Sequence, residues 1–338
     1  MLRPRVSILL PCRNASATID ECVGSIVSQS LRDFEVVAID DQSTDDTRLK
    51  LREIARQDSR FRVFCSPRPG LVPSLNFGLE RATSDCIARM DADDRMHPRR
   101  LELQHRYLED NVQVSALGSR VKVFSEDGVT EGLRAYLLWL NGCISEEAIA
   151  RDIYLESPLA HPSVMFRRKA IIDAGGYREG PFPEDYDLWL RLVANGKVLS
   201  KLPQTLLEWR DSPARTSRRN PRYSREAFDR LRAEYLQQDP RLLRHRDNLV
   251  IWGAGRTTRK RVRHLLDAGF RPLAWVDIDP RKIGNLIDGV PVVDPLWLAS
   301  AGRPFVLSYV AVHGARECIE GELDRLGYRK GRDYLHVG

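Results

Sequence analysis

IARMDADDR, residues 87–95, joins a short apolar run to three aspartates, Asp91, Asp93 and Asp94. Consecutive strand residues face opposite sides, so Asp91 and Asp93 project together if the extended backbone continues through Ala92. Converging carboxylates repel each other unless a cation joins them. Hard ions such as Mg²⁺ or Mn²⁺ take oxygen ligands from carboxylates, water and phosphates. The stretch therefore predicts a divalent-metal and diphosphate site at the end of a buried strand.

A helix cap is the alternative explanation for the same aspartates. Asp93 or Asp94 would then cap a helix that starts near Pro98, and Asp91 would be solvated. The D-x-D pattern alone does not decide between a metal site and a cap.

The segment upstream has the pattern of an α/β sheet. Four short apolar runs, separated by segments of helical period, predict strands; they are VSILLP (6–11), FEVVAIDD (34–41), FRVFC (61–65) and DCIARMD (85–91). Thr18 and Glu21 have the spacing of a capping box before the first helix. Ligands of open α/β sheets bind at the carboxyl edge of the strands, where the second and fourth runs end in aspartates.

The length of 338 residues favours two domains. After a change of composition at 239–247, VIWGAGR begins a new strand, turn and helix, so we expect a small Rossmann-like α/β domain over 247–338. Gly253, Gly255 and Asp277 match a dinucleotide-binding turn only in part, because Thr258 stands where a third glycine is needed. A regulatory, assembly or nucleotide-sugar-sensing module is favoured, with an inert packing domain as the alternative.

The net charge of +6 is concentrated in residues 211–248, which hold ten arginines against six acids. This local positive charge could bind a phosphorylated ligand, an anionic membrane surface or nucleic acid. A solvated helix face with no ligand explains the arginines equally well. No nucleic-acid motif or aromatic platform accompanies the arginines, which disfavours nucleic acid as a partner. Peripheral contact with a membrane and a homo-oligomer both stay open.

No window approaches the roughly 18 apolar residues of a membrane span, and the first apolar run is too short for a secretory signal. These features predict no transmembrane segment and a cytoplasmic location. The six cysteines have no C-x-x-C pair, so we expect free, buried thiols.

Four motifs in order resemble the family 2 glycosyltransferases of GT-A fold over about residues 5–220: VSILLPCRN, VVAIDDQSTDDT, PGLVPSLNFGLERATSDCIARMDADD and PFPEDYDLWLRL. The resemblance implies a catalytic domain over 1–240, with an open mixed sheet flanked by helices and an arginine-rich helical extension. It implies inverting, metal-dependent transfer of a sugar from a nucleotide-diphosphate sugar, with a UDP-sugar as the expected donor. The acceptor would be a hydroxyl of a glycan or a lipid-linked molecule.

The resemblance also implies a nucleotide site. Pro11, Arg13 and Asp41 would hold base and ribose, and Asp40 and Ser43 would support their loop. Arg68 and Arg89 match positions where basic residues lie near the nucleotide, Asp91 would reach the ribose or the metal, and Asp93 would bind Mn²⁺ or Mg²⁺. Asp94 would shape the turn.

Residues 184–195, EDYDLWLRLVAN, predict a helix that starts with Glu184 and Asp185. The positive end of the helix dipole favours ionised carboxylates and so lowers their pKa. A sugar transfer onto a hydroxyl needs a proton acceptor, and the resemblance assigns that role to Asp185. Both acids could instead be ordinary helix-start residues.

The acceptor side is predicted by resemblance from SPLAHPSVMFRR and AGGYREGPFPED. His161, Glu184, Trp189 and Arg210 are the candidate acceptor residues; structural hydrogen bonding is the alternative for His161, and core packing for Trp189. Relatives often have a metal-binding histidine two residues after the arginine, but this chain has Ser212 there. Water, Asp211 or no further protein ligand are all open.

Two other functions compete. An oxidoreductase built on Gly253 and Gly255 would bind NAD(P) and need no metal. A non-catalytic nucleotide-sugar-binding protein would tolerate Asp185→Asn without loss of function.

Overall fold

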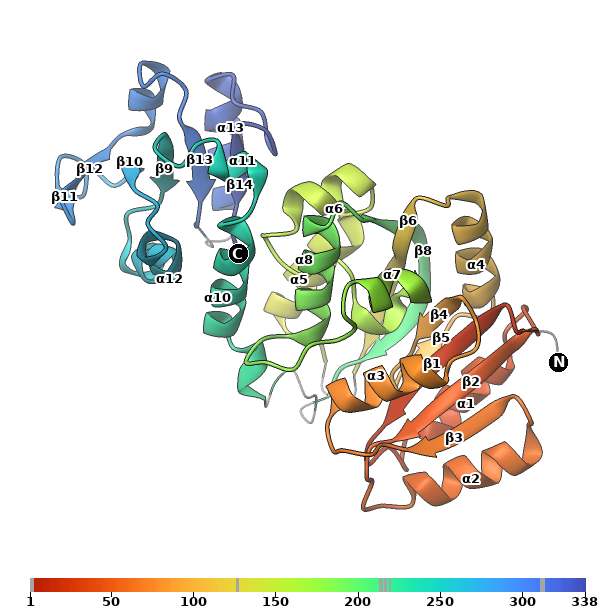
Figure 1. Cartoon of the computed structure of the whole chain (residues 1–338). Helices are drawn as coiled ribbons and strands as arrows, with labels where there is room; N and C mark the ends of the chain where they lie inside the picture. The colour runs from red at the N-terminus through yellow and green to blue at the C-terminus, as the bar shows by residue number, and fades with distance from the viewer. Residues whose placement is uncertain (1–2, 126–127, 213–214, 216–217, 219, 311–313) are drawn as a thin grey trace. The chain divides into compact units, whose positions relative to one another are not determined.

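The computed structural model describes residues 3–125, 128–212, 215, 218, 220–310 and 314–338 (Figure 1). The chain divides into two compact units. The larger comprises Met1–Ile149, Pro158–Gly180 and Glu184–Asn220, and the smaller comprises Ala150–Ser157, Pro181–Pro183 and Pro221–Gly338. Residues 221–240, which we expected to extend the catalytic domain, thus group with the smaller compact unit. The boundaries of the two functional domains remain a prediction.

An eight-stranded mixed sheet forms the larger unit (Figure 1), in the order β3-β2-β1-β4-β7-β6-β8-β5. The neighbours from β3 to β4 run parallel, β7 is antiparallel to both β4 and β6, β6 and β8 are parallel, and β5 is antiparallel to β8. The bounds are β1 Val6–Cys12, β2 Phe34–Asp40, β3 Phe61–Cys65, β4 Cys86–Arg89, β5 Arg95–Met96, β6 Val114–Phe124, β7 Met165–Arg167 and β8 Val198–Arg210. The expected open mixed sheet is confirmed.

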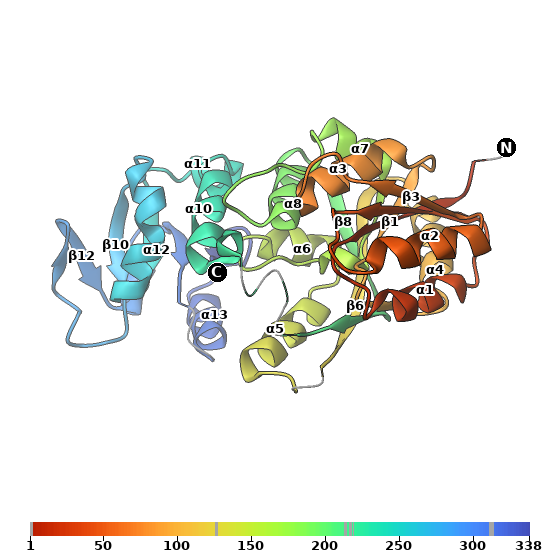
Figure 2. The ribbon, with the colours of Figure 1, turned by 90° about the horizontal axis from the view of Figure 1, so that it is seen from below.

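Helices cover both faces of this sheet. Figure 2 shows α1, α2 and α4 on one face and α3 and α7 on the other. The bounds are α1 Ile19–Val27, α2 Thr47–Gln57, α3 Leu71–Arg81, α4 Arg100–Asp110, α5 Glu131–Gly142, α6 Glu146–Asp152, η1 His161–Ser163, α7 Arg168–Asp173 and α8 Glu184–Ala194. All seven residues of β1 and all seven of β2 are buried between these helix layers. Burial on both faces explains why the two strands are almost continuously apolar in sequence.

The strand register brings the predicted site residues to one edge of the sheet. Cys12 at the end of β1 pairs with Asp40 at the end of β2, and Leu9 pairs with Arg89 at the end of β4. The loops that follow these three strands therefore leave the same carboxyl edge, as expected for a ligand site in an α/β sheet.

The smaller unit holds a second sheet of six strands, in the order β11-β12-β10-β9-β13-β14. All neighbours are parallel except β11 with β12. The bounds are η2 Pro221–Tyr223, α10 Arg225–Leu236, α11 Pro240–Leu243, β9 Leu249–Trp252, α12 Arg256–Asp267, β10 Pro272–Val276, β11 Leu286–Ile287, β12 Val290–Val293, η3 Pro295–Ala299, β13 Phe305–Ser308, α13 Ala315–Arg325 and β14 Tyr334–His336.

Asp277, the candidate ribose-binding acid of this unit, is used internally. Its Oδ2 accepts the Ala254 N–H at 2.8 Å and pairs with Lys282 Nζ at 3.0 Å. These contacts fix the turn after β9, where Gly253 has a φ of 111°. The carboxylate thus supports the turn.

No helix among the described residues is long and apolar enough to span a bilayer. All six cysteines are free; Cys12, Cys22 and Cys143 are buried, but Cys65 and Cys318 are exposed. The prediction of burial was wrong for those two, because Cys65 ends a strand at the sheet edge and Cys318 lies on an outer helix face.

Gly78 lets α3 pack closely on the sheet, and this contact gives a test of the fold. A Cβ at position 78 would lie 2.2 Å from Leu9 Cδ1 and 3.2 Å from Ile39 Cγ1, and both residues are fully buried. We expect Gly78→Ala to lower the free energy of unfolding by about 1–3 kcal/mol in urea denaturation, because overpacking a core costs that much.

Gly24→Ala in α1 is the matched control. Nothing lies within 4 Å of its Cβ, so the higher helix propensity of alanine should raise stability by about 0.5–1 kcal/mol. Equal effects of the two substitutions would contradict the close packing of α3.

Candidate functional site

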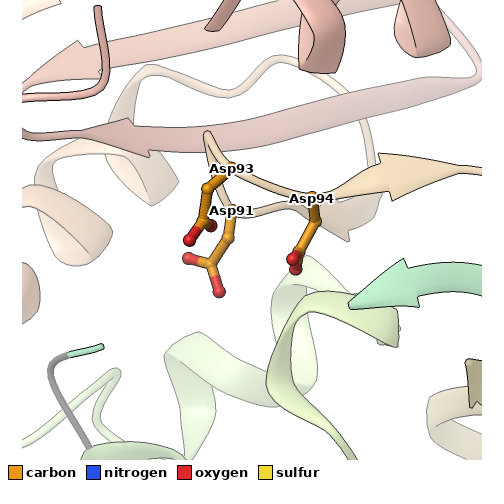
Figure 3. Close-up of side chains that lie close together, drawn as sticks. All are labelled: Asp91, Asp93 and Asp94. Carbon is orange, nitrogen blue, oxygen red and sulfur yellow. The ribbon is translucent and has the colours of Figure 1, made fainter. Parts of the chain in front are cut away.

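The three aspartates lie in a turn between β4 and β5. The strand ends at Arg89, and the Asp94 N–H donates to the Asp91 carbonyl at 3.3 Å. One carboxylate oxygen from each of Asp91, Asp93 and Asp94 lies within 4.8 Å of the others, and Figure 3 shows the three side chains projecting to the same side. The expected extended backbone through Ala92 is wrong, because a turn, and not strand alternation, brings the carboxylates together.

Side chains from distant elements hold the backbone of this turn. Cys22 Sγ donates to the Asp91 carbonyl at 3.3 Å, and Thr18 Oγ1 donates to the Ala92 carbonyl at 3.0 Å. Arg210 Nε donates to the Asp93 carbonyl at 2.8 Å. Three consecutive carbonyls are thus each bound by one side chain, and we call Thr18, Cys22 and Arg210 the turn clamp.

Arg210 also binds a carboxylate of the turn and a residue of α1. Its backbone N–H donates to Asp94 Oδ1 at 2.8 Å, and its guanidinium pairs with Glu21. Arg95 pairs with the same Glu21, and the guanidinium carbons of Arg95 and Arg210 each lie 4.5 Å from the centroid of the Phe124 ring. These contacts place Arg210, predicted on the acceptor side, at the acidic turn.

The predicted capping box of α1 is wrong. Thr18 is the N-cap residue, but its side chain makes no cap hydrogen bond. Its hydroxyl binds the acidic turn, and Glu21 pairs with the two arginines. Tertiary contacts have taken the two side chains that a local motif would have used.

The carboxylates crowd each other in a partly buried place. Burial and the charge of Asp91 raise the pKa of Asp93, and burial with the charges of Asp91 and Asp93 raises the pKa of Asp94. Asp94 Oδ2 is buried and has no hydrogen-bond partner among the described residues. Raised pKa values and an orphaned carboxylate oxygen are what a hard cation would relieve, so the donor set fits Mg²⁺ or Mn²⁺.

The helix-cap alternative does not describe these aspartates. Helix α4 starts at Arg100 with Arg99 as its N-cap residue. Asp93 and Asp94 therefore do not cap it.

Asp211, one of the open candidates for a further ligand, already has cationic partners. Its Oδ2 accepts from Arg218 Nη2 at 2.6 Å, and its Oδ1 lies 3.5 Å from Arg215 Nη1. Asp211 is outside the group of three carboxylates found among the described residues.

Asp41 links two loops at the carboxyl edge. Its buried carboxylate accepts the Gly70 N–H at 2.7 Å through Oδ1 and Arg13 Nη1 at 3.4 Å through Oδ2. Pro11 is buried in β1, whereas the Arg13 side chain is 56% exposed. Arg13 and Asp41 therefore meet, and Pro11 lies two residues before Arg13 at the end of β1.

The predicted support of this loop is present. Asp40 Oδ1 accepts the Ser43 N–H at 3.2 Å, and Ser43 Oγ accepts the Asn14 N–H at 3.1 Å. Arg68 differs from the other nucleotide candidates, because its side chain is 70% exposed and pairs with Glu179 at 3.6 Å.

Asp185 lies in the first turn of α8 beside the buried Glu184. Its Oδ1 accepts the Tyr186 N–H at 2.8 Å. Burial and the charge of Glu184 raise the pKa of Asp185 to about 7. The expected lowering by the helix end is wrong, because desolvation and a neighbouring acid outweigh the helix dipole.

Arg89 connects this acid to the aspartate turn. It is 2% exposed, and its Nη1 lies 2.5 Å from Asp91 Oδ1. Its charge lowers the pKa of Asp185 and opposes the raised pKa values of Asp93 and Asp94. The two acidic groups therefore share one buried cation, whose Nε has no hydrogen-bond partner among the described residues.

The other acceptor candidates are packed inside. His161 Nε2 lies 2.9 Å from Tyr177 Oη, and burial with the charge of Arg89 lowers the pKa of His161. Trp189 is fully buried and meets His161 edge-on, with ring centroids 6.1 Å apart. The Trp189 indole therefore offers no face to a sugar, and core packing, the alternative stated above, describes Trp189.

Sequence reasoning missed the turn clamp and Tyr177. Thr18 and Glu21 gave a signal, but it indicated a local cap, and Cys22 was expected only to be a free, buried thiol. No local pattern marks Tyr177, whose hydroxyl meets a histidine 16 residues away.

Comparisons with known proteins agree with this architecture. The family model described as Glycosyl transferase family 2 matches residues 7–175. The putative glycosyltransferase EpsE of Bacillus subtilis (strain 168) is 34% identical over 226 residues, 65% of this chain and 78% of EpsE. A UDP-Gal:alpha-D-GlcNAc-diphosphoundecaprenol beta-1,3-galactosyltransferase of Escherichia coli is 27% identical, covering 69% of this chain and 82% of that enzyme.

Solved structures share the fold. S. aureus TarS 1–349 in complex with UDP-GlcNAc superposes with a TM-score of 0.54 at 19% identity, over 70% of this chain and 67% of TarS. The mannosyltransferase PcManGT from Pyrobaculum calidifontis, in complex with GDP-Man and Mn²⁺, has a TM-score of 0.50 at 20% identity, over 79% of this chain and 70% of that one. With a family match over half of the chain and the EpsE similarity, the chain belongs to glycosyl transferase family 2 and is a glycosyltransferase of GT-A fold.

Proposed function

We propose that the protein is an inverting, metal-dependent transferase that moves a sugar from a UDP-sugar to a hydroxyl of a glycan or lipid-linked acceptor. The observation that carries the proposal is the cluster of three carboxylates beside the buried Arg89, whose charge also lowers the pKa of Asp185 in the first turn of α8. A transferase of this kind needs both a cation site for the departing diphosphate and a separate proton acceptor.

The donor is assigned to the edge where β1, β2 and β4 end. Pro11, Arg13 and Asp41 would hold base and ribose, and Asp91 and Asp93 would bind the metal ion. A divalent cation held there would neutralise charge on the departing diphosphate. The UDP-GlcNAc bound to TarS and the UDP-Gal in the name of the E. coli relative support a UDP-sugar.

Asp185 is assigned as the base. The acceptor oxygen forms a bond to the anomeric carbon while the bond from that carbon to the diphosphate oxygen breaks, and the hydroxyl proton passes to Asp185. Since Tyr186 N–H occupies Oδ1, we assign the proton to Oδ2. A single displacement inverts the anomeric configuration, and a base with a pKa near the working pH serves it well.

The acceptor is the least constrained part of the proposal. The E. coli relative names a diphosphoundecaprenol-linked sugar as its substrate, which supports a lipid-linked acceptor. Glu184 at the start of α8 is the acceptor candidate next to the base.

An oxidoreductase has less support, because the carboxylate of Asp277 is engaged by Ala254 and Lys282. The Asp185→Asn variant described below distinguishes a non-catalytic binding protein from an enzyme.

The first test is a panel of nucleotide sugars with Mn²⁺ or with EDTA, scored for binding and slow hydrolysis. We expect a UDP-sugar to bind with Mn²⁺ and to lose affinity in EDTA or after Asp93→Ala, because the diphosphate and the carboxylates repel each other without the cation. Asp110→Ala, at the exposed end of α4, is the control for loss of an acid. Tight binding that ignores metal and survives Asp93→Ala would falsify the metal assignment.

The second test is Asp185→Asn. Transfer should fall by about 10²–10⁴-fold while donor affinity stays unchanged, because only proton acceptance is lost. In the wild type the carboxylate must be ionised, so the rate should rise as the pH rises through about 7, the raised pKa of Asp185. Full transfer activity in Asp185→Asn would favour another base or a binding protein.

The third test separates two roles of Arg210. We expect Arg210→Gln to weaken Mn²⁺ binding by about 10–100-fold in calorimetry, as loss of an outer hydrogen bond at a metal site does. Arg95→Gln is the matched control, since Arg95 shares Glu21 and Phe124 with Arg210 but is not part of the turn clamp. Unchanged Mn²⁺ affinity together with a raised KM for the acceptor would indicate that Arg210 binds the acceptor and does not support the metal site.

A further inference from the structure

One face of α12 in the smaller unit is strongly basic. Arg256, Arg259, Lys260 and Arg263 follow the spacing i, i+3, i+4, i+7 and therefore share a face of the helix. All four are exposed, as is Arg225 at the start of the adjacent α10. We call these five residues the α12 basic surface.

The opposite side of α12 holds the helix in place. Thr258, Val262 and Leu265 are buried there, and Arg261 is buried against Asp229 of α10 with Nη2 and Oδ1 2.9 Å apart. The charge of Arg261 is therefore compensated internally, and the helix presents the basic residues outward on a fixed support.

Acidic neighbours compensate only part of the α12 basic surface. Lys260 lies 3.7 Å from Glu226, and Arg263 lies 3.2 Å from Asp267 and 4.0 Å from Asp288. Among the described residues, none forms an ion pair with Arg225, Arg256 or Arg259. Since exposed ion pairs are weak and exchange easily, the face keeps a net positive field.

The basic residues border a hollow of about 910 Å³ that ends at the β11–β12 hairpin. Ile287 and Asp288 line this end. Leu286, the neighbouring residue of β11, is 69% exposed. Leu286 and Ile287 are consecutive strand residues and face opposite sides of the hairpin, so Leu286 does not line the hollow.

The arrangement favours an extended anionic surface over a compact anion. Positions 256 and 263 lie about 10 Å apart along the helix axis, too far for one phosphate to meet both ends. A bilayer presents many anionic headgroups side by side, so it can meet all of these cations at once. Trp275 lines the hollow but is buried, so no aromatic face is offered for stacking nucleic-acid bases.

We propose that the α12 basic surface docks on the anionic headgroups of a phospholipid bilayer. Near such a surface each Lys or Arg strengthens binding by about fivefold. Several cations of this kind give reversible binding, which a peripheral protein needs. The inference is independent of the proposed sugar transfer, because none of its residues lies in the candidate site.

The experiment is co-sedimentation of the full chain with vesicles of phosphatidylcholine alone or mixed with phosphatidylglycerol. The test variant combines Arg256→Gln, Arg259→Gln and Arg263→Gln. Its partition onto the anionic vesicles should fall on the order of 100-fold, about fivefold for each arginine. Raised salt should release the wild type from the anionic vesicles.

The matched control removes the same charge from the larger unit. Arg48, Arg52 and Arg56 are exposed on α2, and their joint replacement by Gln should leave vesicle binding within a few fold of the wild type. Circular dichroism establishes that each variant is folded, and Arg225→Gln with Arg259→Gln serves if the triple variant is not.

Three outcomes would overturn the proposal. The first is equal loss of binding in the α2 and α12 variants, which would indicate a general charge effect. The second is binding to neutral vesicles as strong as to anionic ones. The third is displacement by inorganic phosphate at matched ionic strength, which would indicate a discrete phosphate site in place of a bilayer-docking face.

Discussion

The hydrogen bonds to three consecutive carbonyls are the constraint on which the candidate site depends. Asp91, Asp93 and Asp94 repel each other, and a free loop would relieve the repulsion by turning one side chain away. Thr18, Cys22 and Arg210 each bind one carbonyl of residues 91–93, so the backbone cannot turn. Each such bond contributes only about 0.5–1.5 kcal/mol, but together they hold the three carboxylates in place.

Arg89 solves a second electrostatic problem. Several acids in a partly buried edge would protonate without a compensating charge, because burial disfavours the ionised form. The guanidinium of Arg89 stands next to Asp91 and acts on Asp185 as well, so one buried cation supports ionisation on both sides. Its rigid, permanently charged head suits this place better than a lysine, which loses its proton readily when buried.

The sequence predicts the parts of the structure that local patterns determine. The runs 6–11, 34–41 and 61–65 became β1, β2 and β3 within one residue at each end. Central parallel strands such as β1 and β2 are continuously apolar, and β3 is a short apolar run at the edge of the same sheet. The clustering of the acids was also predictable, since strand ends share an edge. The turn at 91–94 was not, because its shape depends on side chains that are 69 to 117 residues away. Thr18 and Glu21 show the limit clearly: a local motif predicted a cap, and distant partners took both side chains. The pKa of Asp185 likewise depends on burial, which no helix-start pattern reveals.

The long β8 strand has a consequence for how the protein is made. It contributes Arg210 as its last residue, whereas β1 to β4 and the acidic turn are complete more than a hundred positions earlier. A ribosome-bound chain that has not yet released β8 therefore carries the three aspartates on an unbraced loop. Since contacts between distant segments form late in folding, we expect the clustered geometry of the carboxylates to form only when the end of this strand pairs with β6. The growing polypeptide then completes the candidate site only after most of the larger unit has been synthesised.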